Sequence, residues 1–210
     1  MHTMIKGFFA IVFLATSTFA QTSVSVHLGS NVPFTLYQTA DQFFLHDYLA
    51  VGFNAGVSTQ LPLADGVLLS PGVEYNLFPY RRYTQEIFDG WDFVQSSSGQ
   101  GIQQLRIILN VKLSQPSDTS YVKPFLLVSG GYTVERVGRV TLNWQTPSGS
   151  TSTTESNPVY QHFWGYVLGI GATLQIASHV AIEPAVVLRS HGADATYGLL
   201  NLNVIYVLVL

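Results

Sequence analysis

The stretch YLAVGFNAGVSTQL, residues 48–61, decides the fold class of this 210-residue chain. Its apolar face is formed by Leu49, Val51, Phe53, Ala55, Val57, Thr59 and Leu61. The positions between them hold small or polar residues such as Gly52, Asn54 and Ser58. Successive side chains of a β-strand point to opposite faces, so this period of two predicts a strand with two chemically different sides.

Seven further segments show the same alternation. They span residues 23–29, 67–77, 105–114, 122–134, 164–176, 180–190 and 200–210. Most have about the length that a tilted strand needs to cross a bilayer. We therefore predict an all-β fold with eight strands, in which each strand follows the previous one as an antiparallel neighbour.

The lengths of the connections alternate, which supports a meander. Residues 30–46, 79–101 and 135–160 are long connections, whereas 62–66, 115–120 and 177–179 are short. The last connection, residues 191–195, breaks the pattern by being brief. Short turns at one end and long loops at the other are typical of eight-stranded transmembrane barrels. No stretch holds 18 consecutive apolar residues, so a membrane-spanning helix is not expected.

Composition favours a membrane barrel over a soluble, ligand-binding barrel. Apolar residues make up 47% of the chain and charged residues only 10%, against roughly 25% in soluble domains. The face opposite the apolar one is mainly Gly, Ala, Ser, Asn and Gln, which suits the narrow interior of a small barrel. A net charge of −3 excludes a basic nucleic-acid surface, and the absence of cysteine excludes disulfides and thiolate metal sites.

The first 20 residues have the layout of a cleaved signal peptide. Lys6 precedes an apolar run from Gly7 to Leu14, and Thr18-Phe19-Ala20 places small residues at the cleavage positions before Gln21. The apolar run is too short for a membrane anchor. We therefore predict a signal peptide at residues 1–20 and a barrel domain at residues 21–210.

Taken together, these features resemble the small eight-stranded outer-membrane β-barrel proteins of the OmpA/OmpX-like group. The segment Lys123-Pro124-Phe125 running into Gly130-Gly131-Tyr132 adds to the resemblance. The resemblance implies an integral outer-membrane location in a double-membrane bacterium and insertion by the barrel assembly machinery. It also implies non-enzymatic roles such as adhesion, envelope integrity or defence, and no cofactor.

Isolated charges on the second face predict a polar network inside the barrel. Glu74 and Arg106 fall at comparable heights on neighbouring strands, which predicts an ion pair that Arg189 joins. The remaining members of the set are Lys112, Lys123 and Glu183. Unpaired charges in a narrow interior are costly. Two interpretations stay open, a plug that closes the barrel and a gate or selectivity ring in a small-solute pore; the small diameter favours the plug.

Two sets of exposed residues are candidates for contacts with lipid or partners. The predicted aromatic girdle at the long-loop end consists of Tyr132, Trp164 and Tyr166. The predicted loop surface, which could contact lipopolysaccharide phosphates or a partner protein, consists of Tyr80, Arg81, Arg82, Tyr83, Phe88, Trp91 and Phe93. Residues 135–144 are expected to continue a strand pair beyond the membrane, with a flexible Ser/Thr-rich tip at 149–154 and an edge open to strand addition.

Enzymatic activity is the less favoured alternative. Ser190-His191 followed by Asp194 is the one cluster that suggests an acyl hydrolase acting on lipid A, but adjacent strand residues point to opposite faces. The lipid A hydrolase pattern requires Ser two residues after His, and this chain has Ala193 there. The histidines lack metal-ligand spacing. We expect a monomeric, non-enzymatic barrel without metal or cofactor.

Overall fold

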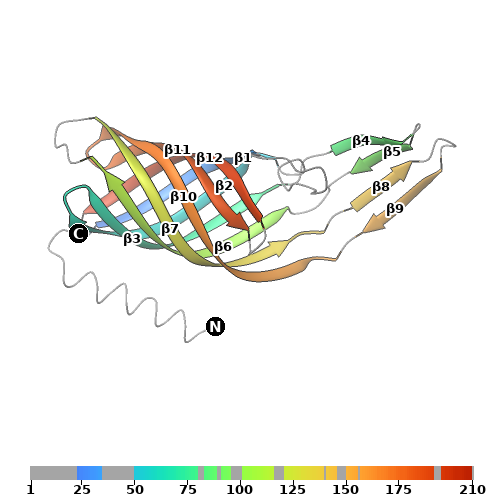
Figure 1. Cartoon of the computed structure of the whole chain (residues 1–210), viewed down its shortest axis with the longest axis horizontal. Helices are drawn as coiled ribbons and strands as arrows, with labels where there is room; N and C mark the ends of the chain where they lie inside the picture. The colour runs from blue at the N-terminus through green and yellow to red at the C-terminus, as the bar shows by residue number, and fades with distance from the viewer. Residues whose placement is uncertain are drawn as a thin grey trace.

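The computed structural model describes residues 23–34, 50–79, 83–88, 91–95, 101–115, 121–139, 141–145, 150–155, 157–191 and 195–209. Eight strands close into an antiparallel barrel in the order β1-β12-β11-β10-β7-β6-β3-β2 (Figure 1). They are β1 (Ser23–Phe34), β2 (Gly52–Ala64), β3 (Val67–Phe78), β6 (Ile102–Ser114), β7 (Val122–Val137), β10 (Val159–Ala177), β11 (Val180–His191) and β12 (Ala195–Val209). The predicted eight-stranded barrel is confirmed.

The barrel closes because its first strand pairs along its whole length with the last strand. The register of β1 and β12 runs from Ser23 opposite Val209 to Phe34 opposite Gly198. Closure leaves no strand edge within the barrel, so the backbone groups find partners without water. The short turn between β2 and β3 contains Gly66 with a φ of 76°, a conformation that glycine adopts without steric cost.

Several strands extend beyond the predicted segments. β1 continues from the predicted end at residue 29 to Phe34, and β12 begins at Ala195, before the predicted start at residue 200. β7 reaches Val137 and β10 begins at Val159. The added residues include Asn31 and Glu135, polar side chains that are buried inside the barrel. Their polarity is typical of loops, which is why the alternation rule ended these strands early.

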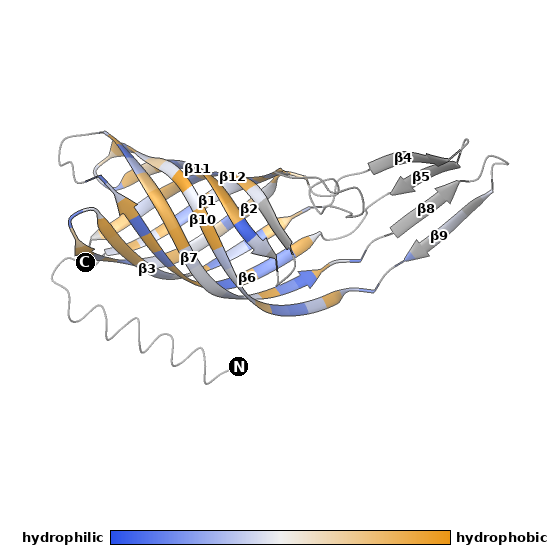
Figure 2. Ribbon diagram, in the orientation of Figure 1, coloured by the Kyte–Doolittle hydropathy of each residue, from blue (hydrophilic) through white to orange (hydrophobic). Residues whose placement is uncertain are grey.

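Side chains alternate between the outside of the barrel and its interior, as the period of two requires. On β6, Leu105 and Leu109 are exposed on the outside, whereas Arg106 and Ile108 between them are buried. Figure 2 shows apolar residues alternating with more polar ones along the barrel strands. The apolar set therefore faces outward, as predicted from the composition of the opposite face.

The two long connections on either side of β6 and β7 form a second sheet beyond the barrel (Figure 1). Its order is β4-β5-β8-β9, with β4 at Tyr83–Phe88, β5 at Trp91–Gln95, β8 at Thr141–Gln145 and β9 at Thr151–Glu155. We name it the outer sheet. β8 and β9 continue the β7–β10 pair, as expected, but residues 151–154 belong to a strand and not to a flexible tip. The alternation rule missed this because Ser and Thr are common in turns and in strands alike.

In the described part of the chain, no helix is long and apolar enough to span a membrane.

Candidate functional site

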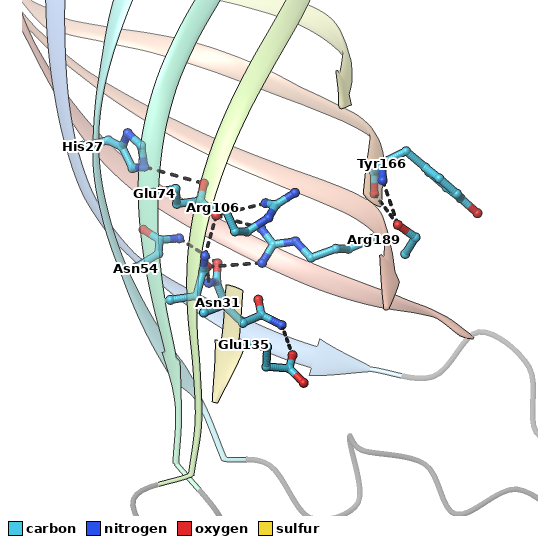
Figure 3. A network of polar contacts seen from close by, with 11 residues as sticks. His27, Asn31, Asn54, Glu74, Arg106, Glu135, Tyr166 and Arg189 are labelled. Atoms are coloured by element: carbon cyan, nitrogen blue, oxygen red, sulfur yellow. Dashed lines mark hydrogen bonds and ion pairs between the residues drawn. The ribbon is translucent and has the colours of Figure 1, made fainter. Parts of the chain in front are cut away.

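The central feature of the barrel interior is a carboxylate held between two guanidinium groups. Glu74 on β3 accepts hydrogen bonds from Arg106 on β6 and from Arg189 on β11, and both N–O distances are 3.1 Å (Figure 3). Both arginine side chains are buried. The Cα of Glu74 lies opposite that of Arg106 in the β3–β6 register, whereas β11 is on the other side of the barrel. The structure therefore contains the predicted Glu74–Arg106–Arg189 cluster.

A row of asparagines extends this cluster across three neighbouring strands. The Asn76 amide donates to Glu74 Oε1 at 2.6 Å, and Asn76 Oδ1 accepts from Asn31 at 2.8 Å and from Arg189 at 3.2 Å. Asn54 donates to Asn31 at 2.7 Å. Sequence reasoning missed these residues as members of the network. Their signal was available, because Asn54 and Asn76 occupy the inward positions of their strands.

Two further polar contacts surround the cluster. His27 Nε2 lies 3.8 Å from Glu74 Oε2, so a third basic side chain faces the same carboxylate. Gln104 donates to Glu135 Oε2 at 2.7 Å, and Glu135 is fully buried (Figure 3). Glu135 was predicted to begin the connection that continues the strand pair beyond the membrane; the extension of β7 places it inside the barrel instead. We name the group around Glu74 the upper network. Its members are Glu74, Arg106, Arg189, Asn31, Asn54, Asn76, His27, Gln104 and Glu135.

A second cluster lies nearer the short turns. The Lys112 ammonium contacts Glu183 and donates to the hydroxyl oxygen of Thr173 at 2.8 Å, and that hydroxyl donates to Glu183 at 2.6 Å. Lys112 Nζ also lies 4.2 Å from the centre of the Phe125 ring, within the range of a cation–π contact. Lys112 and Glu183 are thus brought together as members of an interior polar network.

Lys123 does not join either cluster. It lies on the inward side of β7, where its Cα is opposite that of Thr173 on β10. Among the described residues, no hydrogen bond or ion pair involves its ammonium group. The neighbouring carboxylate and hydroxyl already serve Lys112.

The remaining interior space is small and partly apolar. The buried side chains Phe78, Ile102, Val167, Val187 and Leu199 form one hydrophobic cluster, although they come from β3 and β6 on one wall and β10, β11 and β12 on the other. A cavity of about 110 Å3 lies against this cluster, with Val167 and Val187 in its lining. Its lining includes Ser25, His27, Ser129, Asn203 and members of both polar clusters.

The predicted girdle residues lie on the outside of one strand pair, near the long loops. Trp164 and Tyr166 on β10 are exposed, and Tyr132 on β7 is half-buried. The Tyr132 ring lies 5.4 Å from that of Trp164, measured between centroids. The sequence assigned these three residues to the outward face, and their exposure agrees with that assignment.

The predicted loop surface is described only in part. Tyr80, Arg81 and Arg82 lie outside the described residues. Tyr83 and Phe88 begin and end β4, and Trp91 and Phe93 are on β5, so these four residues are part of the outer sheet. β5 pairs with β8, which joins the loop that carries them to the neighbouring long loop.

The candidate hydrolase cluster has its serine engaged with the backbone. Ser190 Oγ accepts a hydrogen bond from the Tyr166 backbone N–H at 2.7 Å, and the Ser190 side chain is buried. This contact lies next to Val167 and Arg189, the last pair of the β10–β11 register at that end. Asp194 lies outside the described residues. Within the described part of the chain, no three His, Asp or Glu side chains converge in a way that could hold a metal ion.

Comparisons with known proteins found similar solved structures only. No family model matches the sequence, and no curated protein matches it. The N-terminal β-barrel domain of Pseudomonas aeruginosa OprF is 12% identical, with 89% of this chain and 97% of that chain covered and a TM-score of 0.48. Neisserial surface protein A is 16% identical, with 88% and 96% covered and a TM-score of 0.44.

A third similar structure is Ail, the attachment invasion locus protein of Yersinia pestis, in complex with the heparin analogue sucrose octasulfate. It is 10% identical, with 91% of this chain and 100% of that chain covered and a TM-score of 0.42. Because these identities and TM-scores are low, the barrel assignment rests on this chain's own strand pairing. In structure, this chain is similar to small eight-stranded outer-membrane β-barrels.

Proposed function

We propose that this chain is an integral protein of a bacterial outer membrane, with a structural and surface-interaction role. The observation that carries the proposal is the closed barrel with an apolar exterior and a polar, cross-linked interior. A closed barrel is one of the few backbone arrangements that satisfies its hydrogen bonds in hydrocarbon. On this proposal residues 1–20 direct export, the barrel assembly machinery inserts the chain as a monomer, and outer-membrane lipids surround it.

The interior supports a structural role over transport. Arg189 and Glu74 connect strands on opposite walls, and Lys112 on β6 connects to Glu183 on β11. An eight-stranded barrel is only wide enough for its own side chains. Contacts that cross the interior tie the two walls together, so the interior acts as a plug that holds the barrel's shape.

The outer sheet supports a role in binding partners at the cell surface, as in adhesion. It extends from the long-loop end of the barrel (Figure 1). β4 and β9 are the edge strands of this sheet, and no described strand pairs with their free edges. Strand edges of this kind can add an extended segment of a partner through backbone hydrogen bonds. The aromatic and basic residues 80–83 precede β5 in the same loop.

Cell fractionation combined with epitope tags tests the membrane location and its orientation. One variant carries a tag inserted after Gly149, between β8 and β9; the matched control carries the same tag after Asp65, in the short turn between β2 and β3. We expect both variants in the outer-membrane fraction, with faster gel migration before boiling than after it. Antibody should label the first tag on intact cells and the second only after permeabilisation.

Two results would contradict the proposal. A folded protein recovered from the soluble fraction without detergent would exclude a membrane barrel. Labelling of the Asp65 tag on intact cells, with the Gly149 tag protected, would place the outer sheet in the periplasm and remove the proposed surface role.

A further inference from the structure

The outer face of the β7–β10 pair carries a concentration of aromatic side chains. On β10, Tyr160, Trp164 and Tyr166 are 64%, 74% and 48% exposed, and His162 between them is exposed as well. Tyr132 on β7 is stacked against His162 at 6.2 Å and tilted against Trp164 at 5.4 Å, measured between ring centroids. We name these five residues the aromatic face.

Elsewhere in the rows that contain the aromatic face, the exposed aromatic residues of the described chain stand singly, with Tyr75 on β3 and Phe53 on β2. In the hydrogen-bonded rows that contain His162, Trp164 and Tyr166, the next outward positions on β6 are Leu105, Ile107 and Leu109. All three are aliphatic. A girdle that only anchors a barrel at the membrane surface is distributed around its circumference. The concentration of five rings on one strand pair, against single rings on β3 and β2, therefore calls for a more specific explanation.

From the short turns toward the long loops, the outward residues of this strand pair change from aliphatic to aromatic to basic. An amphiphilic lipid has its acyl chains, backbone and charged headgroup in the same order. Toward the short turns lie exposed aliphatic residues, with Leu168 at 45% and Ile170 at 59% on β10 and with Leu126 and Val128 on β7. The aromatic face follows. Level with Tyr160, the last member of the aromatic face, is half-buried Arg136, whose Cα lies opposite that of Tyr160. Beyond it is exposed Arg139, which donates to Glu155 at 3.4 Å.

An outward position without a side chain lies beside the aromatic residues. Gly130 is the Cα partner of Tyr166, and a Cβ atom built on Gly130 would meet no heavy atom within 4 Å. The outward surface at this position is therefore open between Val128 below and Tyr132 above. Space of this kind, bordered by rings, accommodates the part of a lipid where the acyl chain meets the headgroup.

We infer that the β7–β10 outer face binds a phosphorylated glycolipid of the outer leaflet. This rests on the proposed membrane location. The acyl chains lie along Leu168 and Ile170, the sugar ring packs on Trp164 and Tyr160, and a phosphate is placed near Arg136 and Arg139. Flat aromatic surfaces with a polar edge suit a saccharide, and guanidinium groups bind phosphate through charge-assisted hydrogen bonds. A phospholipid lacks the sugar that would use the exposed rings.

Lipid retention on the full-length chain tests the inference. The protein is reconstituted in phosphatidylcholine nanodiscs that contain equal small fractions of lipopolysaccharide and phosphatidylglycerol, then extracted in mild detergent. Native mass spectrometry counts the lipids that remain bound. We expect lipopolysaccharide to be retained over phosphatidylglycerol, and we expect Trp164→Ala and Arg136→Gln each to lower that preference roughly tenfold, the effect of losing one good contact.

The matched control is Phe53→Ala, which removes an exposed outward aromatic residue from β2, away from the β7–β10 pair. It should retain the wild-type preference. Dephosphorylated lipopolysaccharide, used with the wild-type protein, should lose most of the retention without any change to the fold.

Three outcomes would overturn the inference. Equal loss in Phe53→Ala and Trp164→Ala would reduce the aromatic face to an ordinary girdle. Equal retention of phosphatidylglycerol would show that any anionic lipid suffices, and undiminished retention of dephosphorylated lipopolysaccharide would remove the role of the arginines. In each case the barrel is still membrane-inserted, so the proposed function stands; only recovery of the protein as a soluble species would remove both.

Discussion

Arg189 on β11 reaches across the barrel interior to Glu74 on β3, with 3.1 Å between the guanidinium nitrogen and the carboxylate oxygen. These two strands stand four places apart in a ring of eight, so they are diametrically opposite. The same carboxylate oxygen accepts from Arg106 on the strand next to β3. One carboxylate thus links both walls of the barrel and is the shared acidic partner of two buried cations.

Removing Glu74 should therefore destabilise the barrel strongly. In Glu74→Ala two buried guanidinium groups lose their shared carboxylate, and breaking a buried ion pair on one side costs about 3–5 kcal/mol. The free energy of unfolding, measured by guanidinium denaturation in phospholipid vesicles, should fall by about that amount. The control is Arg139→Ala, which breaks an ion pair whose two side chains are 59% and 55% exposed and should cost about 0–1 kcal/mol. Equal costs for the two variants would contradict the role given to Glu74.

A charge on the outward face should be costly where the wall meets the middle of the bilayer. Leu168 is exposed on the outside of β10, so Leu168→Arg should lower the free energy of unfolding by about 2–4 kcal/mol. Ser152→Arg, on an exposed position of β9 in the outer sheet, should have a much smaller effect. The measurement is the same denaturation experiment, and similar losses in the two variants would argue against lipid around Leu168.

Two adjacent glycines on β7 should respond in opposite ways to the same substitution. A Cβ on Gly131 would lie 2.4 Å from the backbone carbonyl oxygen of Ile107, whereas a Cβ on Gly130 meets nothing within 4 Å. Gly131→Ala should therefore destabilise by about 1–3 kcal/mol through overpacking. Gly130→Ala should be neutral or stabilising by up to about 1 kcal/mol, because it reduces the freedom of the unfolded chain. A reversed order of the two thermal transition temperatures would contradict the inward and outward assignments on this strand.

Because side chains from opposite walls meet in the barrel interior, we expect that the purified protein does not form a steady pore. The buried side chains of Phe78, Ile102, Val167, Val187 and Leu199 meet between opposite walls, and the two charged clusters lie beside them. Planar-bilayer recordings at neutral pH should therefore show no stable single-channel steps. A reproducible conductance would favour the small-solute pore over the plug.

We predict that Ser190 stabilises the barrel through its hydrogen bond with the Tyr166 backbone and does not act in a hydrolytic reaction. Because its hydroxyl accepts the Tyr166 N–H, Ser190→Ala should cost about 1–3 kcal/mol of stability, the penalty for an unsatisfied buried donor. The acylation pattern of lipid A, compared by mass spectrometry, should be the same in cells producing the wild type, Ser190→Ala, His191→Ala or no protein. Deacylation that depends on Ser190 or His191 would restore the enzyme hypothesis.

Much of the barrel is determined locally, and the sequence carries that part. The alternation in residues 48–61 and in its counterparts reflects a property of each strand by itself, because neighbouring side chains point to opposite sides wherever the strand is placed. Loop lengths likewise belong to the chain alone. These two features were sufficient to predict the number of barrel strands, their outward faces, and the facing of Trp164 and Tyr166.

The partners of the interior residues depend on tertiary structure. The stagger with which β1 and β12 close the ring decides that Arg189 meets Glu74 and Asn76, 115 and 113 positions away in the chain. It also brings Lys112 and not Lys123 to Glu183. The pairing of β5 with β8 in the outer sheet is equally non-local. No periodicity within a segment encodes such contacts, because they arise only once the strands are held in register around a closed barrel.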